Sequence, residues 1–450
     1  MKDQDEILSL LTETLKEAPN GSECDILFVA HQESLTRFTQ SAIHQNLVVD
    51  NARAVVRVIL DGGIGVAATN EMIPEALSAA VQKATEIARE QTQPEEVVSL
   101  PTPSPIGVIS TYDERTACFG PSDRAASLVR LFNQAGNHRL TLSGAFSTSA
   151  GAVAVANSKG IHLFQPVTSA SLNLLAFSHN GSGYASAIGR SIADFNPMDL
   201  AETAVEKCLQ ATDPKEIEPG EYDVLLEPQA VGDLLEWTSY IGFGAREFQE
   251  GTSFMAERLG QRIAGDNITI RDDALDPRGL PFPFDLEGTP KEKVTLINRG
   301  VASAVVYDRQ TAAREAKQST GHSLGAELPN RPMALNIVFE TGTSTFREML
   351  GQLERGLLVT RFHYINGYLD TRNALLTGMT RDGTFWVERG KPQYGVKNLR
   401  FADSMLRVLS NVVAVGSEAR AVSFGDDLLG AAVCPAILVK GFRFTSGTDH

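Results

Sequence analysis

The sequence lacks the closely spaced histidines and cysteines of common metal-binding motifs. Its 450 residues include eight histidines, and no two of them lie three to five positions apart, the spacing that lets one helix hold zinc. The four cysteines lie far apart and form no Cys-x-x-Cys pair; they are Cys24, Cys118, Cys208 and Cys434. We therefore expect scattered reduced thiols rather than disulfides or a structural zinc site.

An excess of basic charge and long apolar runs are also missing. The formal net charge is −15, whereas a protein that grips DNA needs a concentrated positive surface, so we expect no direct nucleic-acid contact. No segment approaches the roughly 20 apolar residues that span a bilayer. The acidic stretch 1–6 and the amphipathic residues after it do not resemble a signal peptide. These absences predict a cytoplasmic protein that does not enter membranes.

Two common catalytic or binding loops are absent as well. The glycine-rich segment 61–65 is followed by a strand-like stretch, whereas a phosphate-binding loop leads directly into a helix. No Gly-x-Ser-x-Gly elbow occurs, which argues against serine hydrolase chemistry. We interpret the glycines at 61–65 as a hairpin turn.

The residues that are present predict an α+β protein with two domains. A chain of 450 residues exceeds what one hydrophobic core usually supports. Apolar residues recur at helical spacing over 7–15, 74–89, 122–134 and 198–211. Alternating apolar and polar residues predict strands over 25–30, 34–38 and 55–60, and antiparallel hairpins over 140–177.

A polar, proline-bearing linker at 212–220 separates the two predicted domains. We place an N-terminal domain of mixed helices and antiparallel sheet at 1–215, and a C-terminal domain of mostly antiparallel sheet at 216–450. Glycine-bearing segments at 380–383 and 388–390 predict hairpin turns in the second domain, because glycine accepts positive φ without a steric penalty.

Short motifs distributed over most of the chain resemble the TldD/PmbA family of zinc peptidases, also called modulators of DNA gyrase. Their order and spacing carry the resemblance. They are Ser34-Leu-Thr-Arg-Phe38, Ser41-Ala-Ile-His-Gln-Asn46, Asp285-Leu-Glu-Gly-Thr-Pro290, Gly356-Leu-Leu-Val-Thr360 and Asn373-Ala-Leu-Leu-Thr-Gly378.

The resemblance implies a zinc site in one branch of the family and its absence here. In the catalytic TldD branch, a His-Glu-x-x-x-His helix precedes a Gly-Thr-Ser, its histidines and a C-terminal cysteine hold zinc, and its glutamate activates water. Here Gly251-Thr252-Ser253 is present, but Glu236, Trp237 and Ile241 occupy the motif positions, and no histidine lies between His179 and His322. The segment 423–430 replaces the cysteine-bearing one.

The chain therefore resembles the PmbA/TldE branch, in which the family pattern implies a two-protein peptidase. We expect no catalytic residue, metal or cofactor in this chain, and zinc in a TldD-type metallopeptidase partner. The family-matching segments are expected to shape a channel for the peptide substrate. The candidate channel residues are Arg37, His44, Asn46, His322 and Asn373.

Three hypotheses stay open at this point. The first is a non-catalytic PmbA/TldE-type subunit of a peptidase acting on unfolded or extended peptides. The second is a metal-dependent hydrolase whose unconventional ligands come from Asp285, Glu287, His322 and His363. The third is a non-enzymatic homodimer that binds peptides.

Overall fold

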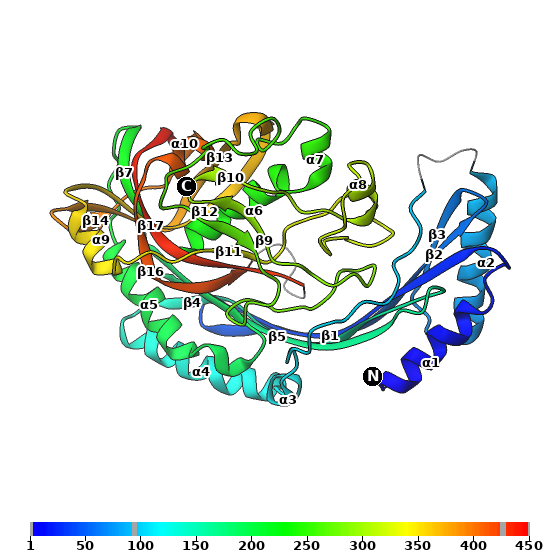
Figure 1. Ribbon diagram of the computed structural model, residues 1–450. Helices are drawn as coiled ribbons and strands as arrows, with labels where there is room; N and C mark the ends of the chain where they lie inside the picture. The colour runs from blue at the N-terminus through cyan, green and yellow to red at the C-terminus, as the bar shows by residue number, and fades with distance from the viewer. Residues whose placement is uncertain (1–2, 92–96, 424–428, 449–450) are drawn as a thin grey trace.

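Two β-sheets and ten α-helices form the part of the chain that the computed structural model describes, residues 3–91, 97–423 and 429–448 (Figure 1). This arrangement confirms the α+β class. The helices are α1 Gln4–Leu15, α2 Pro74–Glu90, α3 Glu114–Ala117, α4 Pro121–Asn137, α5 Pro197–Gln210, α6 Pro228–Gly242, α7 Ala245–Gln249, α8 Arg309–Ala313, α9 Phe346–Gln352 and α10 Met405–Ser410, with 3-10 turns η1 Ile192–Asp194 and η2 Thr371–Asn373. In these ranges, none of the helices is both long and apolar enough to cross a membrane.

The N-terminal sheet is antiparallel, with the order β3-β2-β1-β4-β5-β6. Its strands are β1 Glu23–Thr39, β2 Ala42–Leu60, β3 Gly63–Thr69, β4 Thr141–Asn157, β5 His162–Phe177 and β6 Ser182–Gly189. The 17 residues of β1 extend roughly 55 Å at about 3.3 Å per residue. The sequence predicted two strands here, but the ladder to β2 continues through the polar residues after Ala30 without a break until Arg37.

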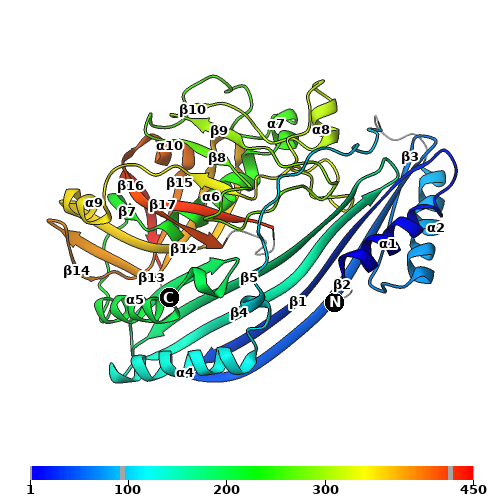
Figure 2. The ribbon, with the colours of Figure 1, turned by 60° about the horizontal axis from the view of Figure 1, so that its bottom comes forward.

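The two faces of this sheet bury different partners, because successive side chains of a strand point to opposite faces. Ile26 and Phe28 pack in one cluster with apolar residues of α1 and α2. Leu27 points the other way and belongs to a cluster that includes Phe282 and Phe284 of the C-terminal domain. Figures 1 and 2 show the long strands as a curved layer, with the helices on one face and the C-terminal domain on the other.

Among the described residues, the second sheet has eleven strands, most of them paired antiparallel. The strands are β7 Gly220–Leu226, β8 Ile270–Asp272, β9 Val294–Asn298, β10 Val301–Ala302, β11 Ile337–Phe339, β12 Arg355–Asp370, β13 Leu375–Glu388, β14 Lys391–Gly395, β15 Leu399–Ser404, β16 Val412–Ser423 and β17 Ala431–Gly447. The order is β10-β9-β8-β11-β17-β15-β13-β12-β7, with β14 on β13 and β16 on β17. Strand β7 pairs with both β12 and β17. The strands β17, β15, β13, β12 and β7 therefore form a closed ring.

One predicted turn in this sheet was wrong. The segment 380–383 lies inside β13, where the register to β12 shifts between Val359 and Arg361. Asp382 and Gly383 have φ values of 50° and 125°, so the positive-φ signal marks an irregularity within the strand rather than its end. By contrast, residues 389–390 do connect β13 to β14, as predicted.

The first sheet ends at Gly189 and the second begins at Gly220, with α5 and the polar segment 211–219 between them. The domain limits 1–215 and 216–450 stay a prediction.

Candidate functional site

Helix α6 carries Glu236, Trp237 and Ile241, the residues that the family resemblance predicts at the positions of the zinc motif. Pro228 occupies the first turn, where its missing N–H and fixed φ are tolerated. The helix packs against β12 and β17. Glu236 and Trp237 are half-buried, and Ile241 is only 1% exposed. A side chain at position 241 therefore belongs to the core of the C-terminal domain.

Aromatic packing fills the space around Trp237. Its ring lies 5.5 Å from that of Tyr368 in an edge-to-face arrangement and 6.1 Å from that of Tyr240. Strand β12 passes close by, since a Cβ added at Gly367 would lie 3.1 Å from Trp237 and 3.3 Å from Ile241. The motif positions thus contribute apolar contacts, with no nitrogen ligand for a metal at Trp237 or Ile241.

Cys434 lies on β17 against the same helix. Its sulfur would be 3.8 Å from a Cβ added at Gly232, and the residue is fully buried. Burial, followed by the charge of Asp233, raises the pKa of the Cys434 thiol well above its ordinary value. Cys434 therefore packs against α6 as a small buried side chain of the C-terminal core. Residues 424–428 of the segment predicted to replace the family's cysteine loop lie outside the described residues.

Asp233 links α6 to both sheets. Its carboxylate accepts hydrogen bonds from Gln229 Nε2 and from the Phe362 N–H of β12, both at 2.8 Å. Gln229 in turn accepts one from the Ser186 hydroxyl of β6 at 2.9 Å. Burial outweighs these bonds and raises the pKa of Asp233 to about 7. This carboxyl group is a candidate proton acceptor near neutral pH.

His322 lies in a buried hydrogen-bonded pair rather than in an open channel. It follows α8 in a glycine-flanked loop, and its side chain and that of Asp272 are both 0% exposed. Its Nε2 lies 3.0 Å from Asp272 Oδ1, and its Nδ1 lies 2.9 Å from Thr320 Oγ1. Both ring nitrogens are therefore engaged within the protein. His363, on β12, is half-buried, and burial and the charges of Arg361 and Arg381 lower its pKa.

The other channel candidates occupy two separate places. Arg37, His44 and Asn46 lie together on the exposed part of the β1–β2 hairpin, where Asn46 accepts a 2.6 Å hydrogen bond from the Thr36 hydroxyl. Asn373 is exposed in η2 of the second sheet, where it bonds to Asp370 at 2.8 Å. The structure places the first three on one hairpin, where Arg37 and Asn46 point to opposite faces because Asn46 pairs with the neighbouring Thr36. It places Asn373 and His322 on the other domain.

A buried charge cluster joins the two domains. Arg57 of β2 donates to both carboxylate oxygens of Asp25 at 2.8 and 2.9 Å, and its Nη1 donates to Glu287 at 2.7 Å. Asp285 accepts backbone bonds from Glu287, Thr289 and Ser323 at 2.9–3.0 Å. Burial and the Glu287 charge raise the pKa of Asp285 to about 7.

Sequence analysis missed Arg57 and Asp25 as partners of this loop. The available signal was a charged residue inside an apolar strand, Val56-Arg57-Val58, because a buried charge needs a partner. A buried arginine in the sequence indicates that an acidic partner exists, but it does not identify that partner as Glu287, 230 residues later.

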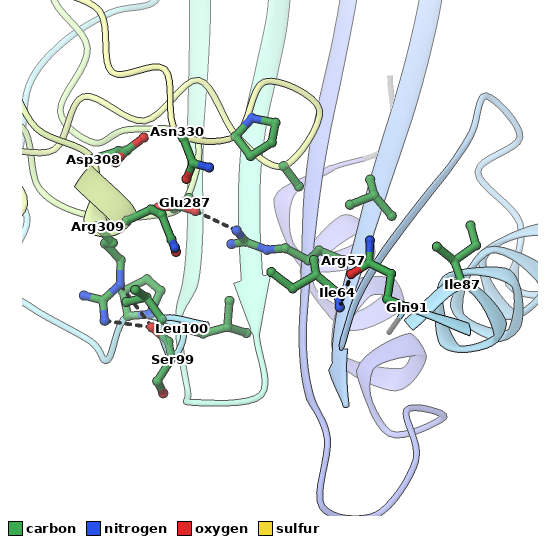
Figure 3. Close-up of a pocket in the computed structure, with 16 residues that line it drawn as sticks. Arg57, Ile64, Ile87, Gln91, Ser99, Leu100, Glu287, Asp308, Arg309 and Asn330 are labelled. Carbon is green, nitrogen blue, oxygen red and sulfur yellow. Dashed lines mark hydrogen bonds and ion pairs between the residues drawn. The ribbon is translucent and has the colours of Figure 1, made fainter. Parts of the chain in front are cut away.

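A pocket of about 440 Å³ opens beside this cluster, between the N-terminal sheet and three loops of the C-terminal domain (Figure 3). The sheet and α2 supply Arg57, Ile64, Ile87 and Gln91, and Glu287, Asp308, Arg309 and Asn330 come from the C-terminal domain. Ser99 and Leu100 of the segment before α3 form another wall.

The zinc ion of the catalytic branch does not fit the residues present. Across residues 3–91, 97–423 and 429–448, no three His, Cys, Asp or Glu side chains are grouped to hold a metal ion. Asp285 and Glu287 share one loop, but the ring of His322 is already bonded to Asp272 and Thr320.

Models of one known protein family match most of the chain. Profiles of the PmbA/TldA metallopeptidase match at three places: domain 1 at residues 24–88, the central domain at 120–211 and the C-terminal domain at 219–446. The chain belongs to the PmbA/TldD metallopeptidase family. The resemblance found in the sequence motifs is thus confirmed at the level of the family.

Individual relatives in this family are distant. The chain is 26% identical to the metalloprotease PmbA of Escherichia coli O157:H7 over 372 residues, which cover 79% of this chain and 78% of the relative. It is 27% identical to an uncharacterized protein of Methanocaldococcus jannaschii over 310 residues, 67% and 71% of the two chains.

Solved structures show the same fold. The crystal structure of TldE from Thermococcus kodakarensis matches with a TM-score of 0.87 and 21% identity, covering 98% of this chain and all of the other. A Thermotoga maritima protein described as a candidate modulator of a DNA gyrase matches with a TM-score of 0.84 and 20% identity, covering 98% and 99%.

Proposed function

We propose that this chain is a PmbA/TldE-type, non-catalytic subunit of a metallopeptidase that acts on unfolded or extended peptides. In this proposal a TldD-type partner chain carries the zinc. The observation that supports it is the composition of α6: Glu236, Trp237 and Ile241 occupy the positions that we align with the zinc motif, and the adjacent Cys434 is buried. The histidine pair that would bind zinc is missing from this helix.

The surface beside α6 supports a role in holding substrate. Tyr368 is 59% exposed and Tyr240 37% exposed, and both contact Trp237. Exposed aromatic side chains offer a large contact area to an extended peptide at a small cost in conformational entropy. The proposed compartment is the cytoplasm, consistent with scattered free cysteines.

The test compares this chain alone, a TldD-type chain alone and a mixture of the two. Zinc per chain is measured by elemental analysis, assembly by size-exclusion chromatography with light scattering, and cleavage with an unfolded reporter peptide. We expect near-zero zinc and no cleavage for this chain alone, and a mixed assembly that cleaves. A TldD-type variant lacking the motif glutamate is the control, and it should assemble without cleaving.

Two alternatives make different predictions in the same experiment. The relative from Escherichia coli carries the name metalloprotease, which favours catalysis by this chain itself. About one zinc per chain and cleavage without a partner would establish that alternative. A homodimer that binds peptides without cleavage, and that leaves a TldD-type chain's activity unchanged, would establish the non-enzymatic one.

A further inference from the structure

Strand β2 has an open edge between the β1–β2 turn and the start of its pairing with β3. The ladder between β2 and β3 begins at Ala54, opposite Thr69. Just before it, Asn70 caps the edge by donating to the Ala52 carbonyl at 3.1 Å. Among the described residues, no strand pairs with this side of residues 45–51, and Figure 2 shows β2 as the outermost strand there. Every second residue of this stretch therefore turns its backbone N–H and C=O away from the sheet.

This edge lacks the features with which proteins usually protect an edge strand. Its sequence, Gln45-Asn-Leu-Val-Val-Asp-Asn51, contains neither lysine nor proline, and its register to β1 is regular. Leu47, Val48 and Val49 are 43%, 50% and 39% exposed, so apolar side chains meet solvent on both faces of the strand. The other end of the sheet is covered, because β6 contacts β13 and β16 of the C-terminal domain. An uncovered apolar edge of this kind is a template for pairing with a further strand.

The sequence of this edge is self-complementary. Paired antiparallel about Val48, two copies place apolar residues opposite apolar ones and polar residues opposite polar ones at every position of 45–51. The opposed pairs are Val48 with itself, Leu47 with Val49, Asn46 with Asp50, and Gln45 with Asn51. The one charged residue faces an amide, so the pairing opposes no like charges. A shift by one residue would place Asn46 opposite Val49 and break the match, so the pattern also selects the register.

We propose that residues 45–51 of β2 form a two-fold symmetric interface with the same residues of a second copy of this chain. The two six-stranded N-terminal sheets then join into one continuous sheet. The symmetric pattern favours a second copy over an unrelated extended peptide, because binding of a peptide requires no such symmetry. An interface of this kind uses the same patch on both copies, so it closes at a dimer rather than extending into a fibre. The proposal goes beyond the proposed subunit role and does not rest on it, since it concerns the chain by itself.

The first experiment measures the mass of the full chain by analytical ultracentrifugation over a concentration series. We expect a dimer that dissociates on dilution. Val48→Lys places two like charges opposite each other at the two-fold axis and should raise the dissociation constant about tenfold or more. Val129→Lys is the matched control, because Val129 is 51% exposed on α4, and it should leave the dissociation constant unchanged. Circular dichroism checks that both variants fold.

Cysteine cross-linking tests the register. Cys118 is exposed and the other three cysteines are buried, so Cys118→Ser supplies the background. In it, Val48→Cys should form a disulfide between copies under mild oxidation, because the Cα atoms of directly opposed residues lie about 4.5–5.5 Å apart. Asn46→Cys alone should not, since the two copies of that position are about 13 Å apart along the strands. A mixture of Asn46→Cys and Asp50→Cys should cross-link.

Three results would overturn the proposal. The first is a monomer at every concentration, and the second is a dimer whose dissociation constant Val48→Lys leaves unchanged. The third is cross-linking of Asn46→Cys alone as efficient as that of Val48→Cys. A monomeric chain whose binding of an unfolded reporter peptide is weakened by Val48→Lys would assign the edge to a peptide instead of a second copy.

Discussion

Arg57 on β2 and Glu287 in the loop before β9 are joined by a 2.7 Å hydrogen bond between Nη1 and Oε1, across 230 positions of sequence. Their side chains are 12% and 11% exposed. This contact and the bidentate pair of Arg57 with Asp25 fix a loop of the C-terminal domain against the N-terminal sheet.

Arg57→Ala should destabilise the protein strongly. It leaves two buried carboxylates without their cation, and breaking a buried ion pair in this way costs about 3–5 kcal/mol. Arg53→Ala is the matched control on the same strand, because its pair with Glu327 is about half exposed and should contribute less than about 1 kcal/mol. Chemical denaturation followed by circular dichroism measures both. Equal losses would show that Arg57 has no special role between the domains.

His322→Ala should lower stability without changing metal content. It leaves the fully buried Asp272 carboxylate with its Asn336 N–H bond but without its ring partner, and losing one partner of a buried hydrogen bond costs about 1–3 kcal/mol. His179→Ala, at an exposed position, is the control and should be nearly neutral. Zinc that is present in the wild type and lost only from His322→Ala would contradict this expectation and support the hydrolase alternative.

Asp233 should make stability fall as pH rises toward neutral. Its folded pKa is about 7, against an ordinary value of 3.8, so between these values the folded chain keeps a proton that the unfolded chain has released. Stability then declines with pH in this window, by up to about 1.4 kcal/mol per unit. Asp233→Asn should have a shallower decline in thermal midpoint. Asp285 acts in the same direction and remains in the variant, so only the difference in slope is informative.

Gly232→Ala should disturb the packing of α6 on β16 and β17. A Cβ at this position would lie 2.3 Å from Val422 Cγ2, and overpacking of this kind costs about 1–3 kcal/mol. Gly136→Ala in α4 is the control, because nothing lies within 4 Å of its added Cβ and alanine favours a helix by about 0.5–1 kcal/mol. If both variants had the same thermal midpoint, α6 would not be closely packed at Gly232.

The parts of the fold that local patterns predict are the helices and the strand-rich second domain. Apolar residues at helical spacing gave α1, α2, α4 and α5 nearly at their observed limits. Strand β1 was predicted as two short strands, because polar residues such as His31 and Glu33 interrupt the apolar pattern. The backbone pairing with β2 nevertheless continues through these residues. Pairing between strands, not composition, sets their length.

The candidate sites were less predictable, since they depend on contacts between distant residues. The absence of the zinc motif from α6 is readable in the sequence, but the packing of Cys434 on Gly232 is not. The sequence also favoured His322 as a channel residue, whereas its burial follows from Asp272, 50 positions earlier. A single sequence contains the residue types of such pairs without stating which residues meet.

The two-sided N-terminal sheet has a consequence for synthesis on the ribosome. All six of its strands lie within the first 189 residues, so they can pair while the remaining chain is still being made. The face that carries Leu27, Val55 and Val153 is covered only when Phe282 and Phe284 have been synthesised, about 100 residues after the sheet is complete. At about 5–20 residues per second, that apolar face stays uncovered for roughly 5–20 s. Between completion of the first sheet and arrival of these two phenylalanines, this face therefore exposes the nascent chain to aggregation.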